Sequence, residues 1–280
     1  MDKEIAGIVK QALKEDIAQG DITTNTLIPK DLNSKAEIIL KAPGVVYGFA
    51  AAHEAFKCLD PHVHFKALVP EGKYLPKGVP IASIRGKTRA LLSAERVALN
   101  FLSYLSAIAT KTYAYVQQVR PFKVSILDTR KTTPTLRHLE RLAVQAGGGV
   151  NHRLNLNSMV MIKDNHLAIC PLKHIPTIID RCKLKKDMAV ELEVTTLAQL
   201  KEALASNVDI VLLDNMMPSM VRKAVNIKDK VNPRVLLEAS GGIVLQNVRK
   251  YAATGVNRIS IGDLTHTRQG IDMSLEIYTS

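Results

Sequence analysis

Five side chains that can carry positive charge follow short apolar segments in the middle of the chain. They are Arg130, Lys131, His152, Arg153 and Lys163. The first two follow the apolar residues 124–127, the last follows residues 159–162, and the middle pair follows three glycines, where backbone can approach a ligand closely. Arginine pairs with carboxylates and phosphates through two hydrogen bonds, whereas lysine supplies a point charge. This spacing predicts a site for a polyanion.

The segments that must position these residues alternate between strand and helix from about residue 123 onward. Apolar runs predict strands at 124–127, 159–162, 188–194, 209–213, 235–238 and 259–261. Helical patterns such as residues 197–205 and 245–254 separate several of them. This alternation is typical of a parallel sheet, either closed into a barrel or open with helices on both faces.

Polar or glycine residues end every one of these predicted strands, which favours a barrel. A barrel assembles its site from the carboxyl ends of several strands, whereas an open sheet concentrates its ligand at one switch point. About six strands are visible, fewer than the eight of a complete barrel. The strand ends therefore favour a barrel over an open sheet.

The first part of the chain has a different pattern. Residues 1–18 predict a helix, and short β-like runs between residues 36 and 87 predict a small sheet. Residues 93–119 form a long helical pattern that is apolar on more than one face, so the domain core and another subunit are candidates to cover it. After Lys131, Thr133 is expected to cap a helix that starts at Pro134 and continues to Gly147.

Composition limits the partners of the protein. The net charge is +12, from 38 Lys and Arg against 26 Asp and Glu, but aromatic residues make up 4% and do not alternate with the basic run at 183–186, so a nucleic-acid platform is disfavoured. No apolar run approaches the roughly 20 residues that span a bilayer. The charged start of the chain does not resemble a signal peptide. Three cysteines without paired spacing suit a reducing cytosol, so a cytoplasmic location without membrane contact is expected.

Seven motifs resemble one known family, quinolinate phosphoribosyltransferase, also called nicotinate-nucleotide pyrophosphorylase (carboxylating), of NAD biosynthesis. They are E-D-I-A-Q-G-D-I-T-T (15–24), A-E-R-V-A-L-N-F (94–101), the block 128–166, E-L-E-V (191–194), L-L-D-N (212–215), E-A-S-G-G-I (238–243) and S-I-G-D-L-T-H (260–266). The resemblance implies an α/β fold, an incomplete (β/α) barrel at residues 113–267 behind an N-terminal α+β domain at residues 1–112. Residues 268–280 would return to pack on the first domain.

The activity that the resemblance implies converts quinolinate and phosphoribosyl pyrophosphate to nicotinate mononucleotide, pyrophosphate and CO2. The residues expected to hold quinolinate are Arg96, Arg130, His152, Arg153 and Lys163. Those expected to hold phosphoribosyl pyrophosphate are Lys131, Glu193, Asp214, Asn215, Ser240, Gly241, Gly242, Gly262 and His266. The catalytic set would be Lys131, Lys163, Glu193 and Asp214.

Two carboxylates, Glu193 and Asp214, are expected to bind Mg2+ directly or through water, and to stabilise positive charge as the glycosidic bond breaks. They could instead simply neutralise the neighbouring cations. Glu191 points to the same side of its strand as Glu193, so spacing does not rank the two; the family pattern favours Glu193.

The family resemblance also implies a homodimer or higher homo-oligomer with a composite active site, in which Arg96 reaches the site of the partner. From the sequence alone, an ion pair of Arg96 with Glu95 is the simpler interpretation. The chain departs from the family pattern at three positions, where Thr135 and Asn155 replace a common glycine and Asp263 replaces a small residue. These changes affect expected loop conformations and no charged site residue.

Three alternative functions stay open. A related pyrophosphorylase could use another aromatic acid, and Lys163 at a strand end could form a Schiff base as in barrel aldolases. The basic composition could also serve a nucleic-acid or anion-binding module.

Overall fold

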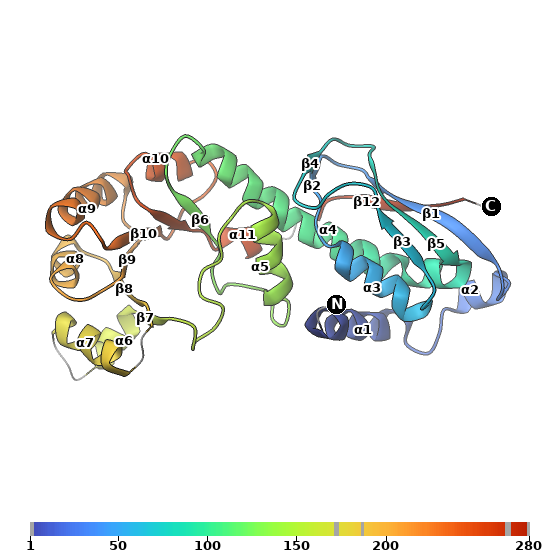
Figure 1. The fold of residues 1–280 in the computed structure, drawn as a ribbon, viewed down its shortest axis with the longest axis horizontal. Helices are drawn as coiled ribbons and strands as arrows, with labels where there is room; N and C mark the ends of the chain where they lie inside the picture. Colours follow the sequence, from blue (N-terminus) through green and yellow to red (C-terminus); the bar gives the residue numbers. More distant parts are fainter. Residues whose placement is uncertain (1–2, 171–173, 186–187, 267–269, 279–280) are drawn as a thin grey trace. The chain divides into compact units, whose positions relative to one another are not determined.

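A computed structural model describes residues 3–170, 174–185, 188–266 and 270–278 (Figure 1). The chain divides into two compact units. The first contains residues 1–113, 132–148 and 266–280, and the second contains residues 114–131 and 149–265.

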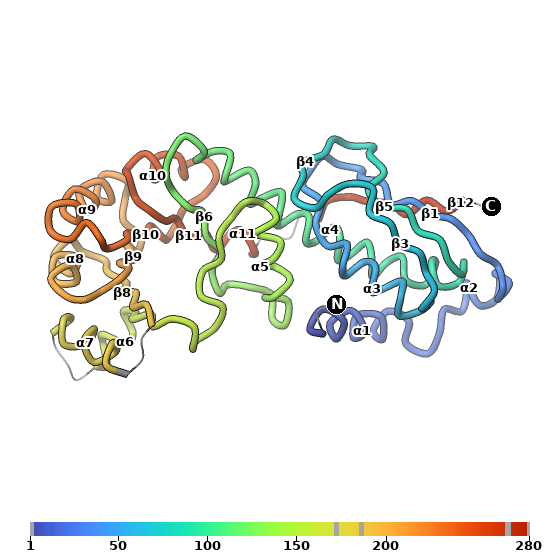
Figure 2. The backbone as a smooth tube through the Cα atoms, in the orientation of Figure 1, coloured from blue at the N-terminus to red at the C-terminus, as the bar shows by residue number. Residues whose placement is uncertain are grey.

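The first unit is built on a four-stranded antiparallel sheet in the order β12-β1-β5-β3. Its strands are β1 (Asn33–Leu40), β3 (His64–Ala67), β5 (Pro80–Lys87) and β12 (Met273–Tyr278). Figure 2 shows β12, near the end of the chain, running beside β1, and Ile38 pairs with Leu275. This pairing confirms that the C-terminal segment returns to the N-terminal domain. A two-stranded ribbon accompanies the sheet, formed by β2 (Gly44–Val45) and β4 (Tyr74–Leu75).

Helices α1 (Lys3–Ile17), α2 (Ile22–Leu27) and α3 (Phe49–Leu59) also belong to the first unit. The family motif at residues 15–24 forms the end of α1 and the start of α2, where the Asp21 side chain caps α2 by accepting a hydrogen bond from Thr24 N–H at 2.9 Å. Asp21 therefore has a local structural role, as expected for an acidic residue that begins a helix.

The long helix α4 (Thr88–Val119) begins five residues earlier than the sequence pattern indicated. Its apolar side chains Leu91, Leu102 and Leu105 are fully buried. Helix α5 (Arg137–Ala146) ends against it, because a Cβ atom on Gly147 would lie 2.3 Å from Ala109 O. Other residues of the same chain thus cover part of the apolar surface of α4.

The prediction that α5 starts at Pro134 is wrong, because the helix starts at Arg137. Thr135 has φ = +69°, which is left-handed and cannot continue a right-handed helix. Thr133 does not cap the helix, since the N-cap residue is Leu136 and no side chain caps it; instead, Thr133 N–H donates to the fully buried Glu140 at 3.0 Å. The hydroxyl of Tyr104 also donates to this carboxylate.

The second unit is a six-stranded parallel sheet in the order β6-β11-β10-β9-β8-β7. Its strands are β6 (Ser125–Leu127), β7 (Val160–Ile162), β8 (Val190–Val194), β9 (Ile210–Asp214), β10 (Leu236–Ser240) and β11 (Arg258–Ser260). Its helices are α6 (Asp164–Ile169), α7 (Ile175–Lys185), α8 (Leu197–Leu204), α9 (Pro218–Val231) and α10 (Val248–Ala252), together with α11 (Asp263–His266) up to Thr265. Figure 1 shows α8, α9 and α10 along the outer side of the strands. All six predicted strands are present, and their carboxyl ends share one edge.

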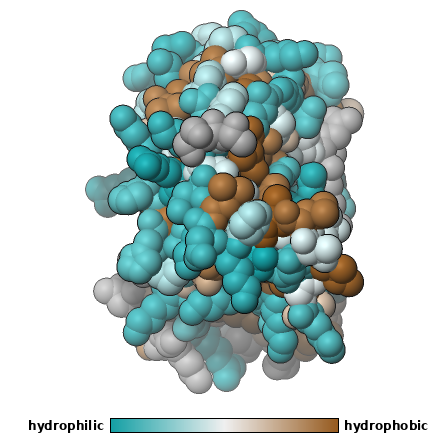
Figure 3. All heavy atoms as spheres, turned by 90° about the vertical axis from the view of Figure 1, so that its right-hand side faces the viewer, coloured by the Kyte–Doolittle hydropathy of each residue, from teal (hydrophilic) through white to brown (hydrophobic). Residues whose placement is uncertain are grey.

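The surface is mixed in polarity. Figure 3 shows brown hydrophobic side chains in patches among teal hydrophilic ones on one face of the molecule. In the first unit, Ile22 and Leu27 of α2 are strongly exposed. Across the described part of the chain, no helix has the length and apolar character that crossing a membrane requires.

Candidate functional site

The carboxyl edge of the parallel sheet carries the polar residues that the sequence singled out. Lys163 directly follows β7, Glu193 is the penultimate residue of β8, and Asp214 ends β9. Ser240 ends β10, and Gly262 lies two residues beyond β11. Because neighbouring strands run parallel, this topology places carboxylates, glycine turns and a lysine along one edge.

Lys163 and Glu193 form an ion pair across neighbouring strands β7 and β8. Lys163 Nζ lies 2.5 Å from Glu193 Oε2, with side chains 42% and 9% exposed respectively. Glu191 is two residues earlier on β8 and is fully buried. The two glutamates therefore have different environments, and Glu193 is the one at the accessible carboxyl edge.

The turn after β9 contacts the glycine turn after β10. Asn215 has φ = +53°, its side-chain amide donates to Asp214 Oδ2 at 2.8 Å, and its backbone N–H donates to Ser240 O at 2.9 Å. Gly241 has φ = +92°, and a Cβ atom there would lie 2.2 Å from Asn215 Oδ1. A glycine is required by both the backbone angle and this close approach. Gly242, with φ = +61°, faces open space.

Lys131 lies beside the glycine turn after β11. A Cβ atom on Gly262 would lie 3.1 Å from Lys131 Cδ, and the Thr265 hydroxyl donates to Lys131 O at 2.7 Å. Lys131 is exposed, so its aliphatic stem packs on the turn while the side chain remains accessible. His266, the last residue of α11, is also exposed.

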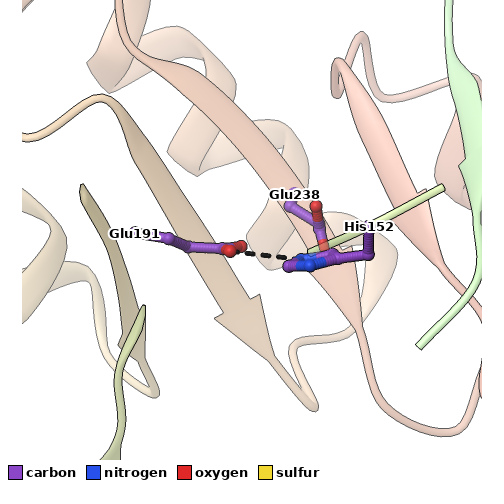
Figure 4. Close-up of side chains that lie close together, drawn as sticks. All are labelled: His152, Glu191 and Glu238. Carbon is purple, nitrogen blue, oxygen red and sulfur yellow. Dashed lines mark ion pairs between the residues drawn. The ribbon is translucent and has the colours of Figure 1, made fainter. Parts of the chain in front are cut away.

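The side chain of His152 is buried against the carboxylates of Glu191 and Glu238 (Figure 4). Its Nε2 atom lies 3.1 Å from Glu191 Oε2 on β8 and 3.3 Å from Glu238 Oε1 on β10. Both glutamates are fully buried. Arg258 of β11 approaches the other oxygen of Glu238, with Nε 2.8 Å from Oε2.

Hydrogen bonds also fix the backbone around His152. His152 N–H donates to Oδ1 of the fully buried Asp128 at 2.6 Å, and Arg153 N–H donates to His152 Nδ1 at 2.7 Å. In this structure both ring nitrogens of His152 face protein groups. Both ring nitrogens of His152 therefore contact residues of the second unit.

The buried carboxylates control protonation in this cluster. Burial disfavours the imidazolium, but hydrogen bonds and charge from Glu191 and Glu238 outweigh it and raise the pKa of His152 to about 9. The hydrogen bond that Nδ1 accepts from Arg153 limits this rise, because an imidazolium carries a proton on Nδ1. Burial raises the pKa of Glu191, although the hydrogen bond to His152 acts in the opposite direction.

Arg153 and Arg130 are close enough for their charges to interact. Burial, followed by the charge of Arg130, lowers the pKa of Arg153. Arg153 also donates from Nη1 to Met159 O at 3.2 Å, while Arg130 is exposed. Two neighbouring guanidinium groups repel each other, which suits a ligand that brings more than one negative charge.

Arg96 lies on α4 in the first unit, where its side chain is exposed. Burial raises the pKa of the neighbouring Glu95, and the charge of Arg96 opposes that rise. Arg96 and Glu95 therefore interact electrostatically within the chain.

The three departures from the family pattern have separate structural consequences. Thr135 occupies a left-handed conformation, which explains why glycine suits that position. Asn155 forms a local turn in which its Oδ1 accepts from Asn157 N–H at 3.3 Å. Asp263 accepts from the Tyr115 hydroxyl at 3.3 Å, and its charge contributes, after burial, to raising the pKa of Tyr115 to about 12.

No role was predicted for Asp128 and Glu238, which contact His152, or for Arg258, which contacts Glu238. A sequence signal exists for the first two, because each is a carboxylate in or directly after an apolar strand whose neighbours are buried. Spacing along the chain does not reveal that strands β8 and β10 present carboxylates to the same imidazole, since that depends on their pairing with β9.

Comparison with known proteins places both halves of the sequence in one family. Residues 21–106 match the N-terminal domain of quinolinate phosphoribosyl transferase, and residues 108–276 match its C-terminal domain. A probable nicotinate-nucleotide pyrophosphorylase [carboxylating] of Bacillus subtilis is 41% identical over 272 residues, covering 95% of this chain and 91% of the relative. The corresponding Mycobacterium leprae protein is 38% identical, covering 96% and 95% respectively.

Solved structures agree with the sequence relatives. The nicotinate-nucleotide pyrophosphorylase of Francisella tularensis superposes with a TM-score of 0.93 at 35% identity, covering 98% of this chain and 96% of that chain. The enzyme of the same name from Ehrlichia chaffeensis gives 0.91 at 38% identity, covering 99% and 100%.

Proposed function

Because the chain belongs to the quinolinate phosphoribosyltransferase family, we propose that the carboxyl edge of its parallel sheet is the active site. The protein is an enzyme of NAD biosynthesis that converts quinolinate and phosphoribosyl pyrophosphate to nicotinate mononucleotide, pyrophosphate and CO2. The main evidence is the strand order β6-β11-β10-β9-β8-β7. It brings basic side chains, carboxylates and glycine turns from distant parts of the sequence to one edge of the sheet.

Quinolinate is held by the cationic side chains near β6 and β7. Arg130 and Arg153 interact electrostatically, and guanidinium groups bind carboxylates through paired hydrogen bonds. Lys163 adds a third positive charge beside Glu193. His152 belongs to this end of the site, and its geometry supports an indirect contribution through Arg153.

Phosphoribosyl pyrophosphate is held by Lys131 and the groups that follow β9, β10 and β11. The backbone N–H groups of Gly241, Gly242 and Gly262 suit a monophosphate, as late-strand turns of barrels commonly do. Ser240, Asn215 and His266 complete this set. The close packing of Lys131 on Gly262 supports a role for the lysine beside the phosphates.

Glu193 and Asp214 are the residues that would hold Mg2+. Both offer carboxylate oxygens from neighbouring strands at the carboxyl edge, and Mg2+ prefers one or two carboxylates together with substrate phosphates. When bound, Mg2+ supplies neutralising charge to the pyrophosphate. Glu193 is also paired with Lys163, so its carboxylate can exchange partners when substrates arrive.

The reaction needs positioning and charge stabilisation from these residues. The ring nitrogen of quinolinate attacks the anomeric carbon, and the bond to pyrophosphate breaks with its electron pair leaving on the pyrophosphate. Glu193 and Asp214 stabilise positive charge on the ribose in that step. The carboxylate beside the new bond then leaves as CO2, its bonding electrons stay on the ring carbon beside the cationic nitrogen, and a proton from solvent adds to that carbon. Arg130 and Arg153 hold the acid throughout.

A homodimer or higher homo-oligomer with a composite active site completes the proposal. Arg96 is exposed on α4, so it is accessible to a second copy of the chain. The exposed apolar side chains of α2 support a subunit contact on the first unit. We also propose a cytoplasmic location, which the three unpaired cysteines Cys58, Cys170 and Cys182 support.

Pyrophosphate release tests the substrate assignment. The purified enzyme is supplied with phosphoribosyl pyrophosphate, Mg2+ and either quinolinate or nicotinate. Quinolinate is expected to give the higher kcat/KM, because the paired arginines suit two carboxylates. A preference for nicotinate or another aromatic acid would contradict the assignment of quinolinate and favour a related pyrophosphorylase.

A further inference from the structure

The buried carboxylates Glu191 and Glu238 have no assigned part in the reaction, although both contact a site residue. Each is fully buried, and each approaches the same atom, His152 Nε2, at 3.1 and 3.3 Å. Burying a carboxylate is costly unless a charge or hydrogen-bond donor compensates it. Two such groups around one imidazole therefore indicate a specific role for that contact.

The tautomer of His152 follows from its other nitrogen. Nδ1 accepts a hydrogen bond from Arg153 N–H at 2.7 Å, so a neutral ring must carry its proton on Nε2. The charged ring also carries a proton on Nε2. In either protonation state, the Nε2 proton faces Glu191 and Glu238.

This proton argues against a metal ion between the three side chains. His152, Glu191 and Glu238 have ligand atoms within 4.8 Å of one another, a spacing that could hold a metal. A metal needs the bare lone pair of an imidazole nitrogen, and here Nδ1 is already an acceptor while Nε2 carries the proton. The close N···O contacts are better explained as an anchor for the histidine ring.

We propose that Glu191 and Glu238 are positioning residues that act through His152 to fix Arg153 at the quinolinate end of the active site. This inference rests on the proposed assignment of Arg153 to quinolinate. Arg153 follows His152 directly in the chain, so the contacts that hold the His152 ring and its backbone N–H also set the position of the Arg153 backbone.

Three residues on different elements contact His152, and a fourth contacts one of these three. Asp128, after β6, accepts from the His152 backbone at 2.6 Å, and Glu191 holds the ring from β8. Glu238 holds the ring from β10, while Arg258 on β11 compensates the charge of Glu238 with an N···O distance of 2.8 Å. The orientation of the His152–Arg153 backbone thus depends on four strands of the rigid sheet. Such support around a binding residue restricts it to the productive geometry.

Steady-state kinetics of Glu191→Gln and Glu238→Gln test the proposal. Each variant keeps the side-chain size but removes a charge that faces Nε2. We expect the KM for quinolinate to rise by at least about fivefold, while the KM for phosphoribosyl pyrophosphate changes by less than about twofold. Glu54→Gln is the matched control, because Glu54 is a buried glutamate on α3 in the first unit. It should leave both KM values unchanged within about twofold.

A double-mutant cycle tests whether Glu191 acts through His152. In His152→Asn, the amide can occupy the position of Nδ1 but does not reach that of Nε2. The KM for quinolinate should rise in this variant, and adding Glu191→Gln should raise it by less than about twofold further. Independent, multiplicative effects of the two substitutions would overturn the proposal. So would equal rises in both KM values for Glu191→Gln and Glu238→Gln.

Two further measurements keep the test decisive. If Glu191→Gln does not fold, Glu191→Asp and Glu238→Gln provide the same comparison, since the shorter aspartate side chain moves its carboxylate away from Nε2. Nitrogen NMR of the wild-type enzyme, labelled at histidine, should show a protonated Nε2; a ring with its single proton on Nδ1 would refute the anchor. If the wild-type enzyme does not use quinolinate, the proposed function itself is refuted. If it does, but the Glu191 and Glu238 variants raise the KM values for both substrates equally, only the positioning role is refuted.

Discussion

Replacing Gly241 with alanine is expected to weaken binding of phosphoribosyl pyrophosphate far more than replacing its neighbour Gly242. Both glycines have positive φ angles, +92° and +61°, so alanine costs about 1–2 kcal/mol of backbone strain at either position. The surroundings differ, because a Cβ atom on Gly242 meets nothing within 4 Å. On Gly241 it would lie 2.2 Å from Asn215 Oδ1 and 2.9 Å from Asn215 N.

The contact with Asn215 cannot be relieved by rotating a side chain alone, since one of the two close atoms is backbone. The turn after β9 must move, and with it the assigned phosphoribosyl pyrophosphate ligands Asn215 and Asp214. We expect Gly241→Ala to raise the KM for phosphoribosyl pyrophosphate by at least about tenfold, which corresponds to about 1.4 kcal/mol. Gly242→Ala should change it by less than about threefold.

Steady-state assays with quinolinate saturating, combined with urea unfolding of both variants, separate binding from stability. Both variants should lose stability, and Gly241→Ala should lose more. Equal KM values for phosphoribosyl pyrophosphate in the two variants would refute the argument that the Gly241–Asn215 contact shapes the phosphate site.

Four further predictions follow from named contacts. Arg130→Lys should keep the fold but lower quinolinate affinity by at least about tenfold in calorimetric titration, because lysine cannot reproduce a bidentate pair; unchanged affinity would refute the assignment. Mixing inactive Arg96→Ala and Arg153→Ala subunits in equal amounts should restore about a quarter of wild-type activity, given subunit exchange and independent sites. Verified heterodimers that stay inactive would show that Arg96 does not act across an interface. Thr135→Gly should raise the free energy of unfolding by about 1 kcal/mol, since relief of the φ = +69° strain exceeds the entropic cost of glycine, and lower stability in urea unfolding would contradict this. The raised pKa of His152 stabilises the fold below pH 6.5, and this contribution should be lost as pH rises to about 9; His152→Asn should flatten that part of the stability profile.

The α/β pattern was predictable because each parallel strand is a short apolar run followed by polar residues. The sequence alone therefore predicts that strand ends such as Asp214 and Ser240 lie at one edge of the sheet. The return of the C-terminal strand to β1 came from the family resemblance, since antiparallel pairing over more than 230 positions leaves no local signal.

Local backbone conformation and burial explain where sequence reasoning was insufficient. The Thr-Pro pair predicted a helix start, yet the left-handed Thr135 delays α5 to Arg137. Spacing did not distinguish Glu191 from Glu193, because alternate strand residues point to the same side. Depth along β8 distinguishes them: Glu193 reaches Lys163 at the edge, whereas Glu191 reaches the buried His152.

The most direct test of the assigned active site is a crystal structure of the wild-type enzyme with quinolinate and a non-reactive analogue of phosphoribosyl pyrophosphate. The quinolinate carboxylates are expected to accept hydrogen bonds from Arg130 and Arg153. The monophosphate of the analogue is expected to lie on the backbone amides of the Gly241–Gly242 turn or the Gly262 turn. Quinolinate bound away from both arginines, or a monophosphate away from both glycine turns, would contradict the assigned site.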